Sequence, residues 1–161
     1  MKPFIKTKNA YRVRGEVSED DILSFARALI AKKFERGVEL TSPDLAHEYF
    51  VHLLAGYEQE VFGCLFLDNQ HRVLLFEELF RGTVNEARIY PREIVKQALS
   101  CNAAAVICVH NHPSGDATPS QCDKDITKRI NDALELVEVR LLDHLVVGGN
   151  DYVSLAKRGF I

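Results

Sequence analysis

The spacing of hydrophobic residues in the first half of the chain predicts two helices followed by a β-hairpin. Apolar residues recur at helical spacing over 18–36 and again over 43–54, where Pro43 suits a first helical position. Apolar runs at 60–67 and 72–76 flank four turn-forming residues. This arrangement is typical of two antiparallel strands joined by a tight connection.

The second half of the chain alternates between strand-like and helix-like patterns. The unbroken apolar run at 103–109 is typical of a central strand that is buried on both faces. Thr118, Pro119 and Gln121 fit the N-cap, N1 and N3 positions of a helix. The other predicted elements are a strand at 83–90, a helix at 91–99 and strands at 141–147 and 152–155. The alternation predicts an α/β fold, in which helices cover a sheet.

Length and composition place the chain among ordinary globular proteins. It has 161 residues, of which 47% are hydrophobic and 27% are charged, and this fits one domain with its own core. No apolar run approaches the roughly 20 residues of a membrane span. The four cysteines form no C-x-x-C pair, so we expect free thiols and a cytoplasmic location.

Charge is distributed unevenly along the chain. Residues 1–15 contain five basic residues and no acidic one, whereas all 23 acidic residues and 15 of the 20 basic residues lie in the remainder. A nucleic-acid-binding protein normally carries a basic face on its folded body. We therefore expect a solvated basic arm at 1–15, and neither a membrane nor a nucleic acid as a partner.

The most informative stretch is His110-Asn111-His112, just past the end of the predicted central strand, with the helix start that follows it. Residues two apart in an extended chain point to the same side, so the two imidazoles should converge. Ser120 and Asp123 share a helix face because they are three apart, although both are also ordinary residues for a helix start. Two imidazoles and a carboxylate suit a catalytic Zn²⁺ site with an open fourth position, and iron, manganese or cobalt also accept such ligands.

A metal-activated water also needs a carboxylate that accepts its proton. Spacing alone leaves several acidic residues open for this role, namely Glu58, Glu60, Glu77, Glu78 and Glu86. His144 lies on a predicted strand and is either a partner of the metal ligands or, as we expect, a structural histidine.

The spacing of His110, His112, Ser120 and Asp123 resembles the JAMM motif of the MPN (JAB-type) metalloprotease domain. In that family the two histidines and the aspartate bind zinc, and the serine stabilises the tetrahedral intermediate. A glutamate that opens a strand in the context E-x-x-G-x-L is the general acid and base. That context here reads Glu60-Val61-Phe62-Gly63-Cys64-Leu65, so the resemblance selects Glu60.

Within that family the chain is most similar to the RadC-like proteins, over roughly 41–161. The matching stretches are Phe80-Arg81-Gly82-Thr83, Tyr90-Pro91-Arg92-Glu93, His110-Asn111-His112-Pro113-Ser114-Gly115-Asp116 and Asp143-His144-Leu145-Val146-Val147-Gly148. The resemblance implies a single MPN domain at 41–161, with a cytidine-deaminase-like mixed β-sheet flanked by helices. A basic arm and a helix at 1–40 would precede it, as in a short, free-standing form of the family.

The resemblance also implies a function. It points to a zinc-dependent, metallopeptidase-like hydrolase that holds one Zn²⁺ per chain and cleaves a peptide or isopeptide bond in an unknown peptide or protein. Two alternatives stay open: a catalytically silent MPN-type interaction module, and a protein associated with DNA repair. A zinc nucleoside deaminase is disfavoured, because that class needs H-x-E with a downstream P-C-x-x-C, and the chain has neither.

Overall fold

The computed structural model describes residues 3–8, 10–32, 35–40, 43–54, 57–82 and 89–161. Its contacts divide the chain into two compact units, Met1–Lys33 and Phe34–Ile161. We call them the N-terminal unit and the C-terminal unit. In the described part of the chain, no helix has the length and apolar character needed to span a membrane.

The N-terminal unit consists of a small hairpin and one helix. Strands β1 (Phe4–Lys6) and β2 (Tyr11–Val13) pair antiparallel, where the sequence predicted only a solvated arm. The ring of Phe25, on helix α1 (Glu19–Lys32), stacks on the ring of Phe4 with 4.0 Å between centroids. The described part of this helix ends at residue 32, so the prediction of a helix up to residue 36 was too long.

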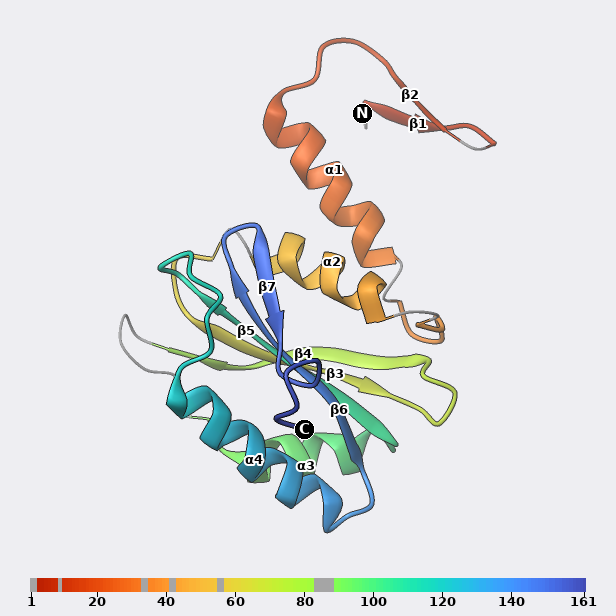
Figure 1. Ribbon diagram of the computed structural model, residues 1–161. Coiled ribbons are helices and arrows are strands. Elements are labelled where there is room, and N and C mark those ends of the chain that lie inside the picture. Colours follow the sequence, from red (N-terminus) through yellow and green to blue (C-terminus); the bar gives the residue numbers. More distant parts are fainter. Residues whose placement is uncertain (1–2, 9, 33–34, 41–42, 55–56, 83–88) are drawn as a thin grey trace. The chain divides into compact units, whose positions relative to one another are not determined.

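Five strands form one mixed sheet in the described part of the C-terminal unit (Figure 1). The strand order is β4-β3-β5-β6-β7, in which β5 and β6 are parallel and the other neighbours are antiparallel. The strands are β3 (Val61–Leu67), β4 (Val73–Arg81), β5 (Ala105–His112), β6 (Arg140–Gly148) and β7 (Asp151–Ser154). The hairpin predicted at 60–76 is therefore β3 and β4.

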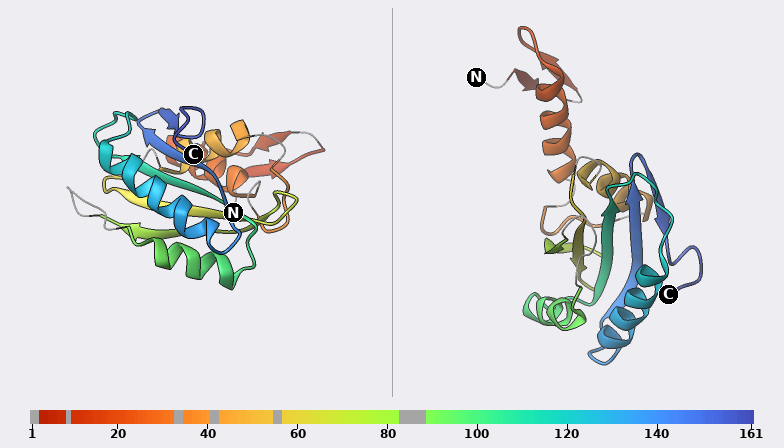
Figure 2. Two further views of the ribbon diagram at one scale, coloured as in Figure 1. Left: turned by 60° about the horizontal axis from the view of Figure 1, so that its bottom comes forward. Right: turned by 90° about the vertical axis from the view of Figure 1, so that its left-hand side faces the viewer.

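Helices cover both faces of this sheet. Figure 2 shows α3 (Pro91–Ser100) and α4 (Gln121–Glu135) on the same side, and their residues Ile94 and Leu134 belong to one buried cluster with Phe62 and Cys108 of the sheet. Helix α2 (Pro43–Leu54) packs on the opposite side, where its Phe50 ring lies 5.3 Å from the ring of Phe76. The mixed sheet flanked by helices confirms the predicted fold class.

Two local predictions near the end of β5 were wrong in detail. Strand β5 continues to His112, because parallel pairing with β6 extends as far as His112 opposite Gly148. Helix α4 has Ser120 as its N-cap instead of Thr118, since the side chain of Ser120 accepts a hydrogen bond from the backbone N–H of Asp123. Most of the strand predicted at 83–90 lies outside the described residues.

The buried carboxylate of Asp143 connects β6 to neighbouring segments on the α2 side of the sheet. One oxygen of Asp143 accepts hydrogen bonds from the backbone N–H groups of His144 and Ala156, at 2.7 and 3.1 Å. The other accepts the Ser154 hydroxyl at 2.7 Å and lies 3.5 Å from Nε2 of His47. The serine donates to the aspartate and not to the histidine, so this trio is a structural brace and not a nucleophilic triad.

The Asp143 brace makes the stability of the folded protein depend on pH. Burial raises the pKa of Asp143, but the bonds from His47, Ser154 and the backbone outweigh burial and hold the pKa below its ordinary value of 3.8. Because its pKa is lower in the folded than in the unfolded protein, the ionised carboxylate stabilises the fold above pH 3.8. This stabilisation is lost as the pH falls through the pKa of the folded state.

We predict that Asp143→Asn lowers the free energy of unfolding at pH 7 by about 2–4 kcal/mol, because buried donors lose a charged acceptor. Denaturation across a pH series measures this loss, and the gap to wild type should narrow below pH 4. Asp151→Asn, at an exposed carboxylate, is the control and should change little. A loss that is the same at pH 3 and pH 7 would contradict the prediction.

Candidate metal centre

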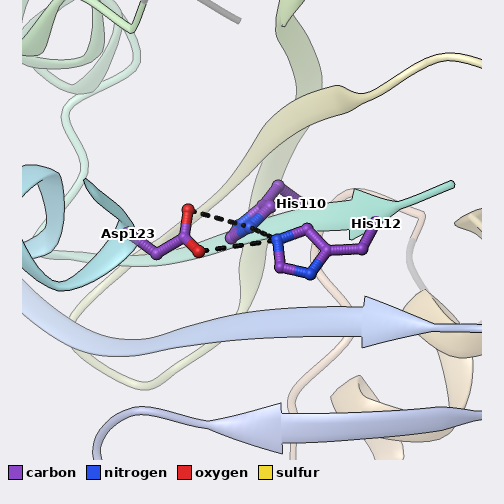
Figure 3. A group of neighbouring side chains, drawn as sticks. All are labelled: His110, His112 and Asp123. Atoms are coloured by element: carbon purple, nitrogen blue, oxygen red, sulfur yellow. Dashed lines mark hydrogen bonds and ion pairs between the residues drawn. The ribbon is translucent and has the colours of Figure 1, made fainter. Parts of the chain in front are cut away.

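The candidate metal ligands come from the end of β5 and the first turn of α4. His110 and His112 project from the same side of β5, as the period of an extended strand requires. The chain then turns back, so that Asp123 in the first turn of α4 faces them (Figure 3). Among the described residues, these three form the one group of histidine, cysteine and acidic side chains whose ligand atoms cluster, within 4.8 Å of one another.

The distances within this group suit a tetrahedral metal ion. The two Nε2 atoms of His110 and His112 are 3.0 Å apart. Nε2 of His110 is 3.2 Å from Oδ1 of Asp123, and Nε2 of His112 is 3.5 Å from Oδ2. Metal–ligand bonds of about 2.0–2.1 Å place the ligand atoms of a tetrahedral zinc roughly 3.3–3.4 Å apart. The side chains therefore need little movement to bind such an ion.

The ring orientation of His112 is fixed by the loop that follows it. Nδ1 of His112 lies 2.7 Å from the backbone oxygen of Asp116. A carbonyl only accepts hydrogen bonds, so Nδ1 carries the proton of the neutral ring and the lone pair of Nε2 is available to a metal.

Gly148 allows that loop to lie so close. A Cβ atom at Gly148 would clash with the backbone nitrogen of Ala117 and would stand 2.7 Å from the backbone oxygen of Gly115. Because β6 ends opposite His112 with a residue that has no side chain, the loop 115–117 packs directly on the strand. The carbonyl of Asp116 is thereby held within hydrogen-bond distance of Nδ1 of His112.

A chain of hydrogen bonds fixes His110 from the other side. The hydroxyl of Thr127 donates to the backbone oxygen of Asp123, so its oxygen is left to accept from Nδ1 of His144. Nε2 of His144 must then be an acceptor, and it lies 2.8 Å from Nδ1 of His110. His110 therefore donates through Nδ1, and its Nε2 lone pair points at the site. His144 is thus a partner of a candidate ligand, not merely the structural histidine that we expected.

Burial keeps this chain of bonds in one protonation state. His144 and Thr127 are both fully buried, at 0% exposure. Desolvation holds the pKa of His144 well below 6.5, and the nearby His110 adds to this effect. A neutral imidazole has one donor and one acceptor nitrogen, which is what the chain from His110 to Asp123 requires.

The carboxylate of Asp123 is oriented by the cap of its own helix. Oδ2 accepts from the hydroxyl and the backbone N–H of Ser120, at 2.6 and 2.7 Å. Burial raises the pKa of Asp123, but the nearby imidazoles of His110 and His112 and the hydroxyl of Ser120 hold it far below its ordinary value. Two imidazole lone pairs and an ionised carboxylate thus face one point, an arrangement that a bound cation stabilises and that fits Zn²⁺.

Glu60 stands immediately before β3, beside the same end of the sheet. Strand β3 runs antiparallel to β5 and pairs Phe62 with His110, so the start of β3 adjoins the end of β5. The hydrogen bond to Asp123 is the main reason that the pKa of His112 is raised, and the negative charge of Glu60 also contributes. Of the other acidic candidates, Glu58 is exposed and Glu78 is engaged by Tyr57 and Arg81.

Of the remaining acidic candidates, Glu77 does not belong to the metal group. Glu77 lies on β4, where it pairs with Cys64 in the middle of β3, and Glu86 lies outside the described residues. Cys122, which is adjacent to Asp123, is exposed. Among the described residues, it does not belong to the group of clustered ligand atoms.

Comparison with known proteins identifies the family. The family model of the RadC-like JAB domain matches residues 40–160. The chain belongs to the RadC family. Two UPF0758 proteins of Vibrio cholerae are 51% and 49% identical to it, over 94% and 96% of this chain and 96% and 97% of their own lengths. A UPF0758 protein of Alcanivorax borkumensis is 54% identical over 86% of this chain and 62% of that protein.

Sequence reasoning found the three candidate ligands of this RadC-family protein but not what orients them. Thr127, Gly148 and the carbonyl of Asp116 carry no signal of their own in the sequence. The stretches that match the RadC-like proteins did contain His144 and Gly148 in one case and Asp116 in another, and these were the available hints.

We predict that Thr127→Val lowers zinc affinity roughly 10–100-fold, the usual cost of losing a partner that orients a ligand. The valine keeps the shape but leaves Nδ1 of His144 without its acceptor, which releases the tautomer of His110. Competition with a chromophoric chelator measures the affinity. Thr7→Val, the same change in the N-terminal unit, is the control, and equal affinities for the two variants would contradict the prediction.

We also predict that Gly148→Ala lowers zinc affinity roughly tenfold or more, because the new methyl group pushes the Asp116 carbonyl away from His112. Gly149→Ala is the matched control: its φ of 57° strains an alanine, but the nearest atom to its Cβ would be 3.7 Å away. It should lose some stability and bind zinc normally. The prediction fails if isothermal titration finds the two variants alike.

Proposed function

We propose that this RadC-family protein is a zinc-dependent hydrolase that cleaves a peptide or isopeptide bond. The observation that carries the proposal is the convergence of two imidazole Nε2 atoms and one carboxylate, all within 4.8 Å, with both Nδ1 atoms already used as donors. Three protein ligands with an open fourth position are typical of catalytic and not of structural zinc sites.

In this proposal His110, His112 and Asp123 hold the ion, and Glu60 moves the proton. A bound Zn²⁺ supplies Lewis-acid chemistry, which lowers the pKa of a water molecule to roughly 7 and polarises the scissile carbonyl. Glu60 accepts the proton of the attacking water and returns it to the departing amine nitrogen. Its position beside His112, which feels its charge, supports this role.

Ser120 has a second role in the proposal, as a donor to the oxyanion that develops on the substrate. Its side chain is solvent-accessible, as such a role requires. In the structure its hydroxyl donates to Oδ2 of Asp123, so that hydroxyl must rotate toward the substrate during the reaction. The backbone N–H of Ser120 continues to hold Asp123 meanwhile.

The location and partners of the protein complete the proposal. The four cysteines are free thiols, in agreement with a reducing cytoplasm. The substrate is a peptide or protein, and the acidic balance of the chain beyond residue 15 disfavours nucleic acid as the substrate.

The test combines metal analysis with a cleavage screen against internally quenched peptides. We predict about one zinc per chain, as one three-ligand site requires. His112→Ala should lose the zinc and the cleavage together. Glu60→Gln should keep the zinc and lose roughly 10²–10⁴-fold in rate, the usual contribution of a general base.

Glu58→Gln is the control for Glu60→Gln, because it removes an exposed carboxylate two residues away. It should cleave at the wild-type rate. Undiminished cleavage by Glu60→Gln would remove Glu60 from the mechanism. A zinc-loaded wild type that cleaves no member of the peptide library would instead favour the silent interaction module.

A further inference from the structure

Asn111 lies between the two candidate histidine ligands, yet its side chain projects from the opposite face of β5. It is only 3% exposed, and it contacts none of the candidate ligand atoms. A buried amide has to satisfy one acceptor and two donor hydrogens, so its partners show what it is there to hold.

The partners of Asn111 are three backbone groups of one short segment. Its Oδ1 accepts the backbone N–H of Val61 at 2.8 Å. Its Nδ2 donates to the backbone oxygen of Gln59 at 3.1 Å and approaches that of Tyr57 at 3.5 Å. The segment 57–61 therefore has alternate residues tied to a single side chain.

The segment held in this way carries the proposed general base. Glu60 stands between two of the residues that Asn111 binds, and its own backbone oxygen accepts the N–H of Gly82 at 2.8 Å. The residues on either side of Glu60, Gln59 and Val61, are thus held by a side chain of β5, the strand that carries His110 and His112. The same strand therefore supports the backbone on both sides of Glu60 and the two candidate histidine ligands.

The chemistry of the site requires an amide at this position. An aspartate keeps an acceptor for Val61 but turns an oxygen toward the carbonyl of Gln59, which then meets another acceptor. An alanine leaves all three backbone groups without their partner. Hydrophobic residues of similar size have the same defect, because they offer neither donor nor acceptor.

We propose that Asn111 is a positioning residue that couples the general base to the metal centre through the backbone of 57–61. The catalytic part of this inference rests on the proposed hydrolase function, whereas the clamp itself does not. Asn111 acts on the position of Glu60 and not on the metal ligands, whose orienting bonds come from Asp116 and His144.

The experiment compares wild type, Asn111→Ala and Asn111→Asp, with Asn69→Ala as the control at an exposed turn. Amide hydrogen exchange of residues 59–61 reports the clamp, zinc affinity reports the ligands, and kcat and KM on the best peptide of the library report catalysis. If Asn111→Ala does not fold, Asn111→Asp carries the test, because it keeps the size of the side chain.

We expect the Val61 amide to exchange roughly tenfold faster in Asn111→Ala, the change that loss of one such hydrogen bond produces. In both variants kcat should fall roughly 10²-fold, as it does for a displaced catalytic group, with KM and zinc affinity close to wild type. Asn69→Ala should match wild type in all of these measurements.

Three results would overturn the inference. One is unchanged exchange at 59–61 in Asn111→Ala, or undiminished kcat in Asn111→Asp if the alanine variant does not fold, which would mean that no clamp exists. Another is wild-type kcat in a variant whose melting temperature has fallen, which would make Asn111 purely structural. The third is a fall in zinc affinity that equals the fall in kcat. Absence of cleavage by wild type overturns the hydrolase function itself, and exchange then still decides whether the clamp exists.

Discussion

The candidate metal centre depends on which nitrogen carries the proton in each of its two imidazole rings. His110 and His112 place their Nε2 atoms 3.0 Å apart, and each ring has already committed its Nδ1 proton to a fixed acceptor. Two lone pairs so close repel each other unless a cation lies between them or beside them, and the ionised Asp123 adds a negative charge at the same point. The surrounding structure can be understood as the means of holding this arrangement together.

The order and direction of the strands place the residues that hold this arrangement together. Strand β5 is central, with β3 antiparallel on one side and β6 parallel on the other. The end of β5 therefore meets the beginning of β3, where Glu60 stands, and the end of β6, where Gly148 leaves room for the loop that bonds to His112. This end of the inner strands therefore brings together the candidate ligands, the Glu60 carboxylate and the residues that hold them in place.

The sequence alone predicts the candidate ligands because their geometry is local. An extended strand places His110 and His112 on one side, and a helix start placed Asp123 within reach, so the convergence follows from backbone periodicity. The choice of Thr118 as N-cap was wrong because Thr118 and Ser120 both fit a capping pattern. The reciprocal bonds between Ser120 and Asp123, which decide between them, are visible only in three dimensions.

The residues that orient the candidate ligands could not be predicted from the sequence, because their contacts join distant parts of the chain. His144 contacts His110 through the parallel register of β5 and β6, and Thr127 reaches His144 from a helix, across separations that no periodicity encodes. Spacing did not distinguish Glu60 either, and only the context E-x-x-G-x-L of the family resemblance selected it. Residues that act through long-range pairing need either a structure or a relative to be recognised.

X-ray absorption spectroscopy of the zinc-loaded protein tests the central interpretation most directly. A site made of His110, His112 and Asp123 should show only nitrogen and oxygen neighbours, at about 2.0–2.1 Å, with the scattering pattern of two imidazoles. A sulfur neighbour at about 2.3 Å, or a spectrum without imidazole scattering, would show that zinc binds elsewhere on the chain.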